Sequence, residues 1–393
     1  MSDCLIVGGG VIGLSLAYEL AGHGLQVRLI DAGQPGREAS WAGAGILPPA
    51  WSASDDPLEQ LTALSNALHT QWSADLLQAT GNDNGFRRSG AIYLARDADE
   101  AGRLSEFAAL AESRGITTQR LSAASLFELE ASLLPRGTLD AAYHVPAECQ
   151  IRNPRHLKAL VVACAQRGVE ISPGVAAEDF DIRGDRVSGV RTNRGLLRAD
   201  AVCITTGAWT AALMKKLGVA PHIKPIRGQM VLLSTARPVL SRIINEGSRY
   251  LVPRVDGRLL VGSTEDDVGF DRGTTAAGVA GLLDFALSLV GDLDSATIER
   301  TWAGLRPATS DGRPYLGALP GVENAFVAAG HFRSGLQLST GTAVVISQLI
   351  RGEQPQIDLS MFRLDRDVSP SETSILAARA ASEAPLAQMK TVR

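Results

Sequence analysis

Short, mostly apolar runs alternate along the chain with longer segments of helical period. The runs CLIV at 4–7, VRLI at 27–30 and AVCI at 201–204 predict strands that are buried on both faces, as parallel sheets require. Residues 58–81, 97–115 and 154–168 carry apolar positions at helical spacing and predict amphipathic helices. Strands that alternate with helices in this way predict an α/β fold.

The pattern changes between about residues 221 and 304, where strand-like runs predominate. GQMVLLST at 228–235 predicts a strand, and SRYLVPRVDGRLLVGST at 248–264 predicts a hairpin that turns at VDG. The segment AAGVAGLLDFALSLVG predicts a helix laid over these strands. Further strands are predicted at 89–95, 169–172 and 186–192. We therefore expect a second, antiparallel sheet beside the parallel one.

Composition and charge exclude several functional classes. The 393 residues, 45% of them hydrophobic, can form one large or two modest domains. The net charge of −4 is spread along the chain without a basic stripe, which argues against nucleic acid as a partner. We expect neither a secretory leader nor a membrane-spanning helix. The four cysteines and six histidines lack metal-ligand or redox spacing, so we expect buried free thiols, a cytoplasmic location and no metal.

The N-terminal segment contains a GxGxxG motif formed by Gly8, Gly10 and Gly13. The motif follows a predicted strand, opens a predicted helix, and is followed about 20 residues later by Asp31 at the end of the second strand. Gly8 permits a tight turn, Gly10 lets a pyrophosphate approach the backbone, and Gly13 lets the helix pack closely on the strand. The helix N-terminus favours phosphate, and Asp31 can accept hydrogen bonds from a ribose. The motif predicts a bound dinucleotide but does not separate NAD from FAD.

The small-residue segment REASWAGAGILPP at 37–49 favours FAD. Few side chains project from it, so an extended cofactor can lie against its backbone. The strands in RADAVCITTGAWT and NAFVAAGHF also end in small residues, at 205–207 and at Gly330. With the strand that ends at the N-terminal glycine motif, these make three strand ends, from the start, the middle and the end of the chain. They predict one sheet whose carboxyl ends bind the ligand. A charged residue, Arg333, follows the last strand, at its joint with a helix predicted to open at Gly335.

The chain resembles the D-amino acid oxidase superfamily of FAD proteins, and within it the bacterial glycine oxidases of thiamine biosynthesis. The matching segments occur in the family's order and include LIVGGGVIGLSLAYEL, ASWAGAGILPP, NPRHLKAL, TTGAW, YLVPRVDGRLLVGSTEDDVGFD, WAGLRPATSDGRPYLG and AAGHFRSG. The resemblance implies a Rossmann-like FAD-binding domain at 1–85, 145–220 and 305–365. It implies a discontinuous antiparallel substrate domain at 86–144 and 221–304, while the Ala/Ser-rich residues 366–393 are expected to form a loosely held tail. It also implies a homotetramer, O₂ as electron acceptor, and oxidation of glycine or of sarcosine, D-alanine or D-proline.

The resemblance also implies which residues bind substrate. Arg306 stands among apolar or small neighbours, where a guanidinium must pair with an acid or a ligand, and it matches the family arginine that binds the substrate carboxylate. Tyr250 matches the tyrosine that hydrogen-bonds the same carboxylate, and Arg333 resembles a second active-site arginine. The helix predicted at 335 is expected to point its positive end at the flavin. His331 and Phe332 are expected to offer backbone contacts, with a role for His331 as general base as a weaker alternative.

The remaining site residues are expected to surround the cofactor. The residues expected to bind FAD, which we expect to be non-covalent, are Gly8, Gly10, Val11, Ile12, Gly13, Asp31, Ala32, Ala39, Ser40, Ala44, Gly45, Ile46, Val175, Thr206, Gly207, Gly330, His331, Phe332, Arg333, Ser334, Gly335, Leu336 and Gln337.

Three residues depart from the glycine oxidase pattern. Ile46 and Glu265 stand where methionines near the substrate are expected, and Ser248 replaces a histidine. Glu265 could face solvent or act on the amine site, so the preferred substrate stays open. Two alternatives also stay open: a D-amino acid dehydrogenase that passes electrons to a quinone or carrier, and a non-catalytic FAD-binding protein. The second would need neither Arg306 nor Tyr250.

Overall fold

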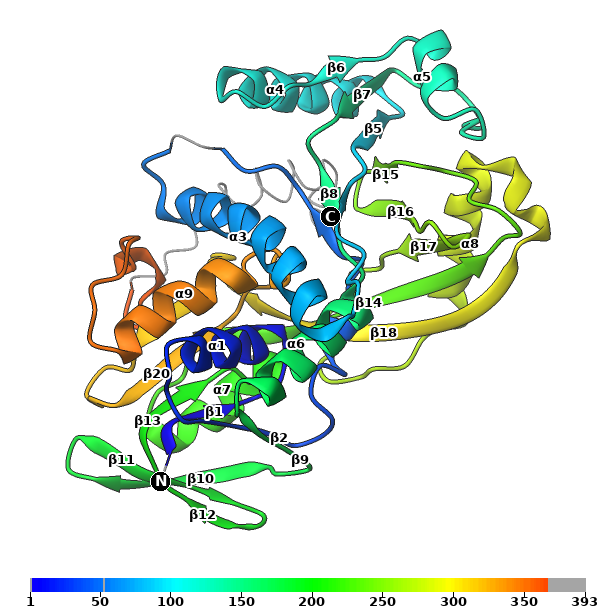
Figure 1. The fold of residues 1–393 in the computed structure, drawn as a ribbon. Coiled ribbons are helices and arrows are strands. Elements are labelled where there is room, and N and C mark those ends of the chain that lie inside the picture. The colour runs from blue at the N-terminus through cyan, green and yellow to red at the C-terminus, as the bar shows by residue number, and fades with distance from the viewer. Residues whose placement is uncertain (1, 52–53, 367–393) are drawn as a thin grey trace, which may run out of the picture.

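A six-stranded sheet carries the N-terminal glycine motif. The computed structural model describes residues 2–51 and 54–366 (Figure 1). The strand order is β19-β20-β13-β1-β2-β9, and every neighbouring pair is parallel except β19 and β20. The strands span Ser2–Val7 (β1), Val27–Asp31 (β2), Glu170–Pro173 (β9), Ala199–Ile204 (β13), Tyr315–Ala318 (β19) and Ala325–Ala329 (β20). The three strand ends rich in small residues therefore lie side by side, on β20, β13 and β1, as predicted.

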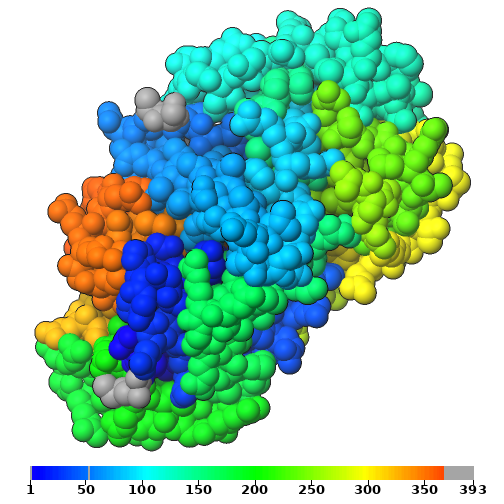
Figure 2. All heavy atoms as spheres, viewed as in Figure 1, coloured from blue at the N-terminus to red at the C-terminus, as the bar shows by residue number. Residues whose placement is uncertain are grey.

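Both faces of this sheet are covered, which explains why the strand runs are mostly apolar. On one face, Cys4 and Ile6 of β1 pack in a core with helices α1 (Val11–Gly22), α3 (Pro57–Thr80), α6 (Asn153–Gln166) and α9 (Ser339–Ile350). On the other, Leu5 and Val7 pack with the small antiparallel sheet of β10 (Ala177–Arg183), β11 (Arg186–Thr192) and β12 (Gly195–Leu197) and with α7 (Thr210–Met214). On the face seen in Figure 2, the N-terminal segment lies between segments from the middle and the C-terminal part of the chain.

A second sheet of eight strands has the order β18-β14-β17-β16-β15-β5-β7-β6. It is antiparallel apart from the β15–β5 pair, and it joins two distant parts of the chain. Its strands span Ala91–Ala95 (β5), Gln119–Arg120 (β6), Ala141–Val145 (β7), Ile223–Ser234 (β14), Ile243–Glu246 (β15), Arg249–Pro253 (β16), Arg258–Gly262 (β17) and Thr297–Thr309 (β18). The hairpin predicted at 248–264 is formed by β16 and β17.

Helices cover this sheet at its ends (Figure 1). The predicted helix at 276–291 is α8 (Ala276–Leu289), which packs on β14, β16 and β17. Helices α4 (Ala98–Ser113) and α5 (Ala123–Leu129) accompany β5, β6 and β7. Short elements complete the segments between the two sheets: α2 (Ala39–Ala42), β3 (Ile46–Leu47), β4 (Arg87–Arg88) and β8 (Cys149–Gln150), and the 3₁₀ turns Gly207–Trp209, Lys215–Leu217, Gly291–Ser295 and Ser360–Phe362.

The predicted start of the last helix is wrong. Helix α9 begins at Ser339, not at 335, and residues 331–338 form successive turns between β20 and α9. Phe332 has a positive φ of 48°, and the N–H of Ser334 donates to His331 O at 3.0 Å, so the backbone closes a turn before helical geometry begins. The helix dipole expected at 335 therefore starts further along the chain. The loosely held tail is predicted at 366–393, and all of these residues except 366 lie outside the described residues.

Candidate active site

A cavity of about 480 Å³ lies at the carboxyl ends of β1, β13 and β20 and extends to the second sheet. The residues predicted to bind cofactor or substrate all line this cavity, with Gly13 as the exception. They come from distant parts of the chain and meet here because the parallel strands end at one edge of the sheet. Sequence reasoning missed several lining residues on the second sheet, among them Tyr93, Asn245, Met230 and Gly304, and also Glu148 on a nearby loop.

Each of the three motif positions requires glycine for a different physical reason. Gly8 has a φ of +112°, and a Cβ there would lie 2.6 Å from the carbonyl oxygen of Thr205 on the neighbouring strand connection. A Cβ on Gly13 would lie 1.9 Å from Gly8 O, so this glycine lets α1 pack against β1 without lining the cavity. Gly10 precedes α1 and has no side chain to cap it. The N–H of Val11 donates to Ser40 Oγ at 2.9 Å, and the next N–H groups of the first turn of α1 are donors beside the cavity, a geometry that fits a pyrophosphate.

Asp31 ends β2 and is held by two backbone donors. Its Oδ2 accepts from the N–H of Gly9 at 2.8 Å, and its Oδ1 accepts from the N–H of Gly33 at 2.7 Å. Each carboxylate oxygen retains accepting capacity, because a carboxylate has about four lone-pair sites. The position, orientation and charge of Asp31 fit a ribose hydroxyl, so this end of the cavity fits the adenosine half of FAD.

Arg306 projects into the cavity from β18. Its Nη2 donates to Ser263 Oγ at 2.7 Å, and its Nη1 donates to Thr264 O at 3.2 Å. No carboxylate among the described residues lies within ion-pairing distance of Arg306, and burial lowers the pKa of its guanidinium. Gly228 on β14, two positions from the strand partner of Arg306, leaves room for the guanidinium, since a Cβ there would lie 2.2 Å from it. The site therefore presents a cation whose remaining donors suit a ligand carboxylate.

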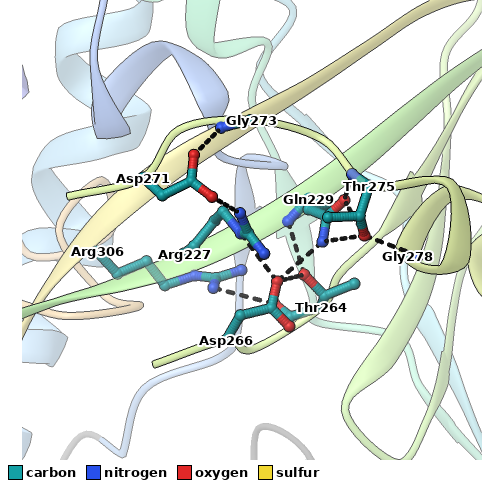
Figure 3. Close-up of polar contacts among 9 residues, drawn as sticks. All are labelled: Arg227, Gln229, Thr264, Asp266, Asp271, Gly273, Thr275, Gly278 and Arg306. Atoms are coloured by element: carbon teal, nitrogen blue, oxygen red, sulfur yellow. Dashed lines mark hydrogen bonds and ion pairs between the residues drawn. The ribbon is translucent and has the colours of Figure 1, made fainter. Parts of the chain in front are cut away.

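A polar network beside Arg306 was not predicted (Figure 3). The buried Arg227 of β14 donates from Nε to Asp266 Oδ2 at 3.1 Å and from Nη1 to Asp271 Oδ2 at 2.5 Å. Gln229 and Thr264 also donate to Asp266 Oδ2, both at 2.9 Å. Burial alone would raise the pKa of Asp266, but these hydrogen bonds outweigh it and lower the pKa. The network holds the segment that carries the Thr264 carbonyl, and so orients Arg306.

Arg333 lies in the turn between β20 and α9. Its Nη2 is 4.0 Å from Glu265 Oε2, and the N–H of Phe332 donates to Pro307 O at 3.0 Å, beside Arg306 in sequence. The turn is thereby tied to β18. Glu265 is not among the residues that line the cavity, and its charge acts on both arginines, because it pairs with Arg333 and opposes the burial that lowers the pKa of Arg306. Tyr250 lines the cavity from β16, and its hydroxyl lies 3.4 Å from Met230 Sδ.

The geometry disfavours His331 as a general base. Its ring is buried, and Nε2 lies 3.1 Å from Thr342 Oγ1 of α9. Burial lowers the pKa of His331 to about 3, so the ring is neutral and weakly basic at neutral pH. His331 instead links the turn at 331–338 to α9.

A second buried histidine supports the same turn. His69 Nε2 lies 3.0 Å from Leu336 O and 2.9 Å from Gln337 O, so it must carry a proton and donate to these carbonyls. Burial lowers the pKa of His69 to about 4, although the two backbone hydrogen bonds oppose the shift. Burial also lowers the pKa of His156, whose ring lies 6.0 Å from that of His69, to about 3.

These histidines predict a loss of stability in mild acid. These histidines have a pKa of about 3 to 4 in the folded protein and of about 6.5 in the unfolded chain, so the unfolded chain binds their protons more readily. The unfolded state gains protons as pH falls below about 6.5, so the free energy of unfolding decreases down to the folded pKa. Between pH 7.5 and 5.5 we expect a loss of about 1.4 kcal/mol for each of the three histidines. Urea denaturation of the purified protein at both pH values measures this loss. In His69→Gln the loss should shrink by about a third, and an unchanged loss would contradict the assignment.

Two further observations concern metal binding and the crossing of a membrane. Within residues 2–51 and 54–366, no group of three or more His, Cys, Asp or Glu side chains is arranged to hold a metal ion. Over the same residues, no helix is both long and apolar enough to cross a membrane. Cys4, Cys164 and Cys203 are buried free thiols, as predicted, whereas Cys149 is only partly buried.

Comparison with known proteins places the same segments in one family. The family model described as FAD dependent oxidoreductase (DAO) matches residues 3–349. A glycine oxidase from Pseudomonas putida is 36% identical over 356 residues, which cover 90% of this chain and 96% of that protein. A bifunctional protein ThiO/ThiG from a Nostoc species is 30% identical over 94% of this chain and 56% of its own length. The crystal structure of glycine oxidase from Geobacillus kaustophilus matches with a TM-score of 0.88 and 35% identity, covering 94% of this chain and 99% of that one. The similarity therefore extends over both sheets and the cavity they share.

Proposed function

Because the chain belongs to the DAO family of FAD-dependent oxidoreductases and is an FAD-dependent amino acid oxidase, we propose that its main substrate is glycine. Sarcosine, D-alanine and D-proline are further candidate substrates. In the proposed reaction, glycine loses two electrons and two protons to become an imine, and O₂ takes up both to become H₂O₂. Water then hydrolyses the imine to glyoxylate and ammonia. The supporting relatives are the glycine oxidases that match along nearly the whole chain.

The observation that carries this proposal is the position of Arg306. Its guanidinium lines the cavity, is partnered by one hydroxyl and one carbonyl, and has no acid of the described chain within ion-pairing distance. A substrate carboxylate can accept two parallel hydrogen bonds from such a group, which sets both its position and its angle. Tyr250 lines the same region and can donate its hydroxyl hydrogen to the same carboxylate. A non-catalytic FAD-binding protein would not require this pair.

The residues present fit FAD. Gly8, Gly10 and the first turn of α1 would hold the pyrophosphate, Asp31 the ribose, and the turn at 330–337 the flavin end. When bound, FAD supplies an acceptor for the hydride that leaves the substrate α-carbon. Arg306 and Tyr250 orient the α-carbon by its carboxylate, while the apolar neighbours of the site exclude water. His331 is engaged with Thr342 and weakly basic, so we assign it no proton transfer from the amine.

We further propose that the imine supplies the thiazole of thiamine. This proposal is supported by the relative named bifunctional protein ThiO/ThiG, because the similarity covers 94% of this chain and 56% of that protein. A D-amino acid dehydrogenase that passes electrons to a quinone or carrier is the alternative electron route. The two differ in whether O₂ consumption follows substrate oxidation.

A spectral experiment on the purified holoenzyme tests the proposal. Anaerobic glycine is expected to bleach the flavin absorbance, and readmitted air should restore it with one H₂O₂ released per glycine oxidised. Sarcosine, D-alanine and D-proline added in turn would rank the substrates. If glycine bleaches the flavin but air restores it only with an added quinone or dye, the dehydrogenase route holds. If glycine leaves the spectrum unchanged while another amine bleaches it, glycine is not the substrate.

A further inference from the structure

The loop between β17 and α8, residues 263–275, reaches from the second sheet to the wall of the cavity. Its Arg272 donates from Nη1 to Glu38 Oε1 at 2.7 Å. The ring of its Phe270 lies 5.7 Å from that of Trp209. Glu38 and Trp209 both line the cavity, whereas no residue of this loop does. The loop therefore contacts the cavity wall from outside, at two segments that are distant in the sequence.

The backbone on each side of Arg272 is held in place (Figure 3). Asp271 Oδ1 accepts from the N–H of Gly273 at 2.8 Å, which closes a short turn around Arg272. Asp271 Oδ2 accepts from Nη1 of the buried Arg227 at 2.5 Å, which ties this turn to β14. The second sheet thus fixes the base of a side chain whose positive charge lies beside Glu38.

Glu38 lies next to the glycine turn at the end of β1. The N–H of Gly36 donates to Gly9 O at 2.7 Å, and the N–H of Val11 donates to Ser40 Oγ at 2.9 Å. Glu38 stands between Gly36 and Ser40 in the chain, so both flanks of this acid are attached to the turn and to the start of α1. These two elements fit the pyrophosphate of FAD. A carboxylate therefore lies close to where a ligand group with two negative charges would bind.

The cavity wall supplies no positive side chain at this end. Among the described residues that line the cavity, the cationic side chains are those of Arg306 and Arg333, at the substrate end. The charged lining residues near the glycine turn, Asp31 and Glu38, are both acidic. A partly exposed carboxylate about 8 Å from two negative charges weakens the binding of the anion by about tenfold. An unpaired Glu38 would thus oppose the cofactor.

We propose that Arg272 is a cofactor-retaining residue, which cancels the charge of Glu38 beside the pyrophosphate site and so keeps FAD bound. The side chains of Arg272 and Glu38 are 57% and 46% exposed, so their ion pair contributes little to the stability of the fold. Its effect falls on the anion that binds next to it. Asp31 needs no such partner, because two backbone N–H groups hold its carboxylate and it fits a ribose hydroxyl. The inference concerns FAD and goes beyond the choice of amine substrate.

The dissociation constant of FAD tests the role of Arg272. The purified holoenzyme is diluted in steps, and free FAD is measured in the ultrafiltrate. In about 10 mM NaCl, where the Debye length is about 30 Å, Arg272→Gln should raise Kd about tenfold relative to the wild-type protein. In about 1 M NaCl, where the Debye length is about 3 Å, the difference should fall below about threefold. This salt dependence is the mark of repulsion by Glu38.

A second substitution separates charge from contact. Glu38→Gln should bind FAD at least as tightly as the wild-type protein, because it removes the acid. Arg272→Gln combined with Glu38→Gln should return Kd close to the wild-type value. Lys224→Gln is the matched control, because Lys224 pairs with Asp267 of the same loop at 2.6 Å and neither residue lines the cavity. It changes the net charge equally and should leave Kd unchanged.

Several outcomes would overturn the inference. If Glu38→Gln released FAD as readily as Arg272→Gln, the pair would act as a tether or Glu38 would itself bind FAD. A loss that stays the same in high salt, or that Lys224→Gln shares, would also contradict local charge cancellation. If Arg272→Gln purifies without FAD, Arg272→Lys decides the matter, because it keeps the charge and should retain FAD. The readout is bound FAD, so a flavin that glycine does not bleach would count against the proposed function alone.

Discussion

Arg306→Ala is expected to lower kcat/KM for glycine by about 10³-fold while FAD stays bound. The guanidinium would make two charge-assisted hydrogen bonds to the substrate carboxylate, each worth about 1.5–3 kcal/mol. Their loss corresponds to roughly 10²–10⁴ in rate, because each 1.4 kcal/mol is a factor of ten. The side chain contacts Ser263 and Thr264 rather than the glycine turn of β1, so the cofactor end of the cavity is left unchanged. Stopped-flow reduction of the flavin at several glycine concentrations measures the effect.

Arg306→Lys is the control for charge alone. Lysine keeps the cation but lacks the planar fork, so it should recover part of the lost rate without restoring wild-type kcat/KM. The flavin absorbance of both variants should match that of the wild-type protein. An Arg306→Ala variant that holds FAD and oxidises glycine at the wild-type rate would show that another group binds the carboxylate.

Gly8→Ala is expected to yield protein that binds FAD about 100-fold more weakly. The backbone at Gly8 has a φ of +112°, which L-residues adopt only with strain, and the new methyl group would meet Thr205 O at 2.6 Å. Strain of about 1–2 kcal/mol together with overpacking of about 1–3 kcal/mol must be relieved by moving the turn. The turn is where the pyrophosphate would approach the backbone. The ratio of flavin to protein absorbance after purification, followed by FAD titration, measures the loss.

Gly24→Ala is the matched control for backbone strain. Gly24 also has a positive φ, +83°, but a Cβ there would meet nothing within 4 Å, and it follows the far end of α1. This variant should lose some stability yet bind FAD as the wild-type protein does. If both variants lost FAD equally, strain in the fold would explain the result, and the close approach at Gly8 would not.

Local motifs explain why much of the fold could be read from the sequence. The strand, glycine turn, helix and acid of residues 4–31 are adjacent in the chain, and each residue type has one physical reason to stand there. The hairpin of β16 and β17 was predicted for the same reason, since its turn residues lie between its strands. The predicted helix start at 335 is wrong because Phe332 adopts a positive φ and the turn after β20 continues until α9 begins at Ser339.

The sequence alone determined the α/β class, the dinucleotide turn and the resemblance that identified Arg306 and Tyr250 as site candidates. Only the tertiary structure decided what surrounds them. Asn245 lies beside Tyr250 and Tyr93 because of strand register, and a shift by one residue would turn each side chain to the other face. Arg227 and Asp266 are 39 positions apart and meet only because the loop after β17 folds back on β14. Such contacts depend on which distant strands pair and in what register, which the packing of the whole sheet decides and no short segment encodes.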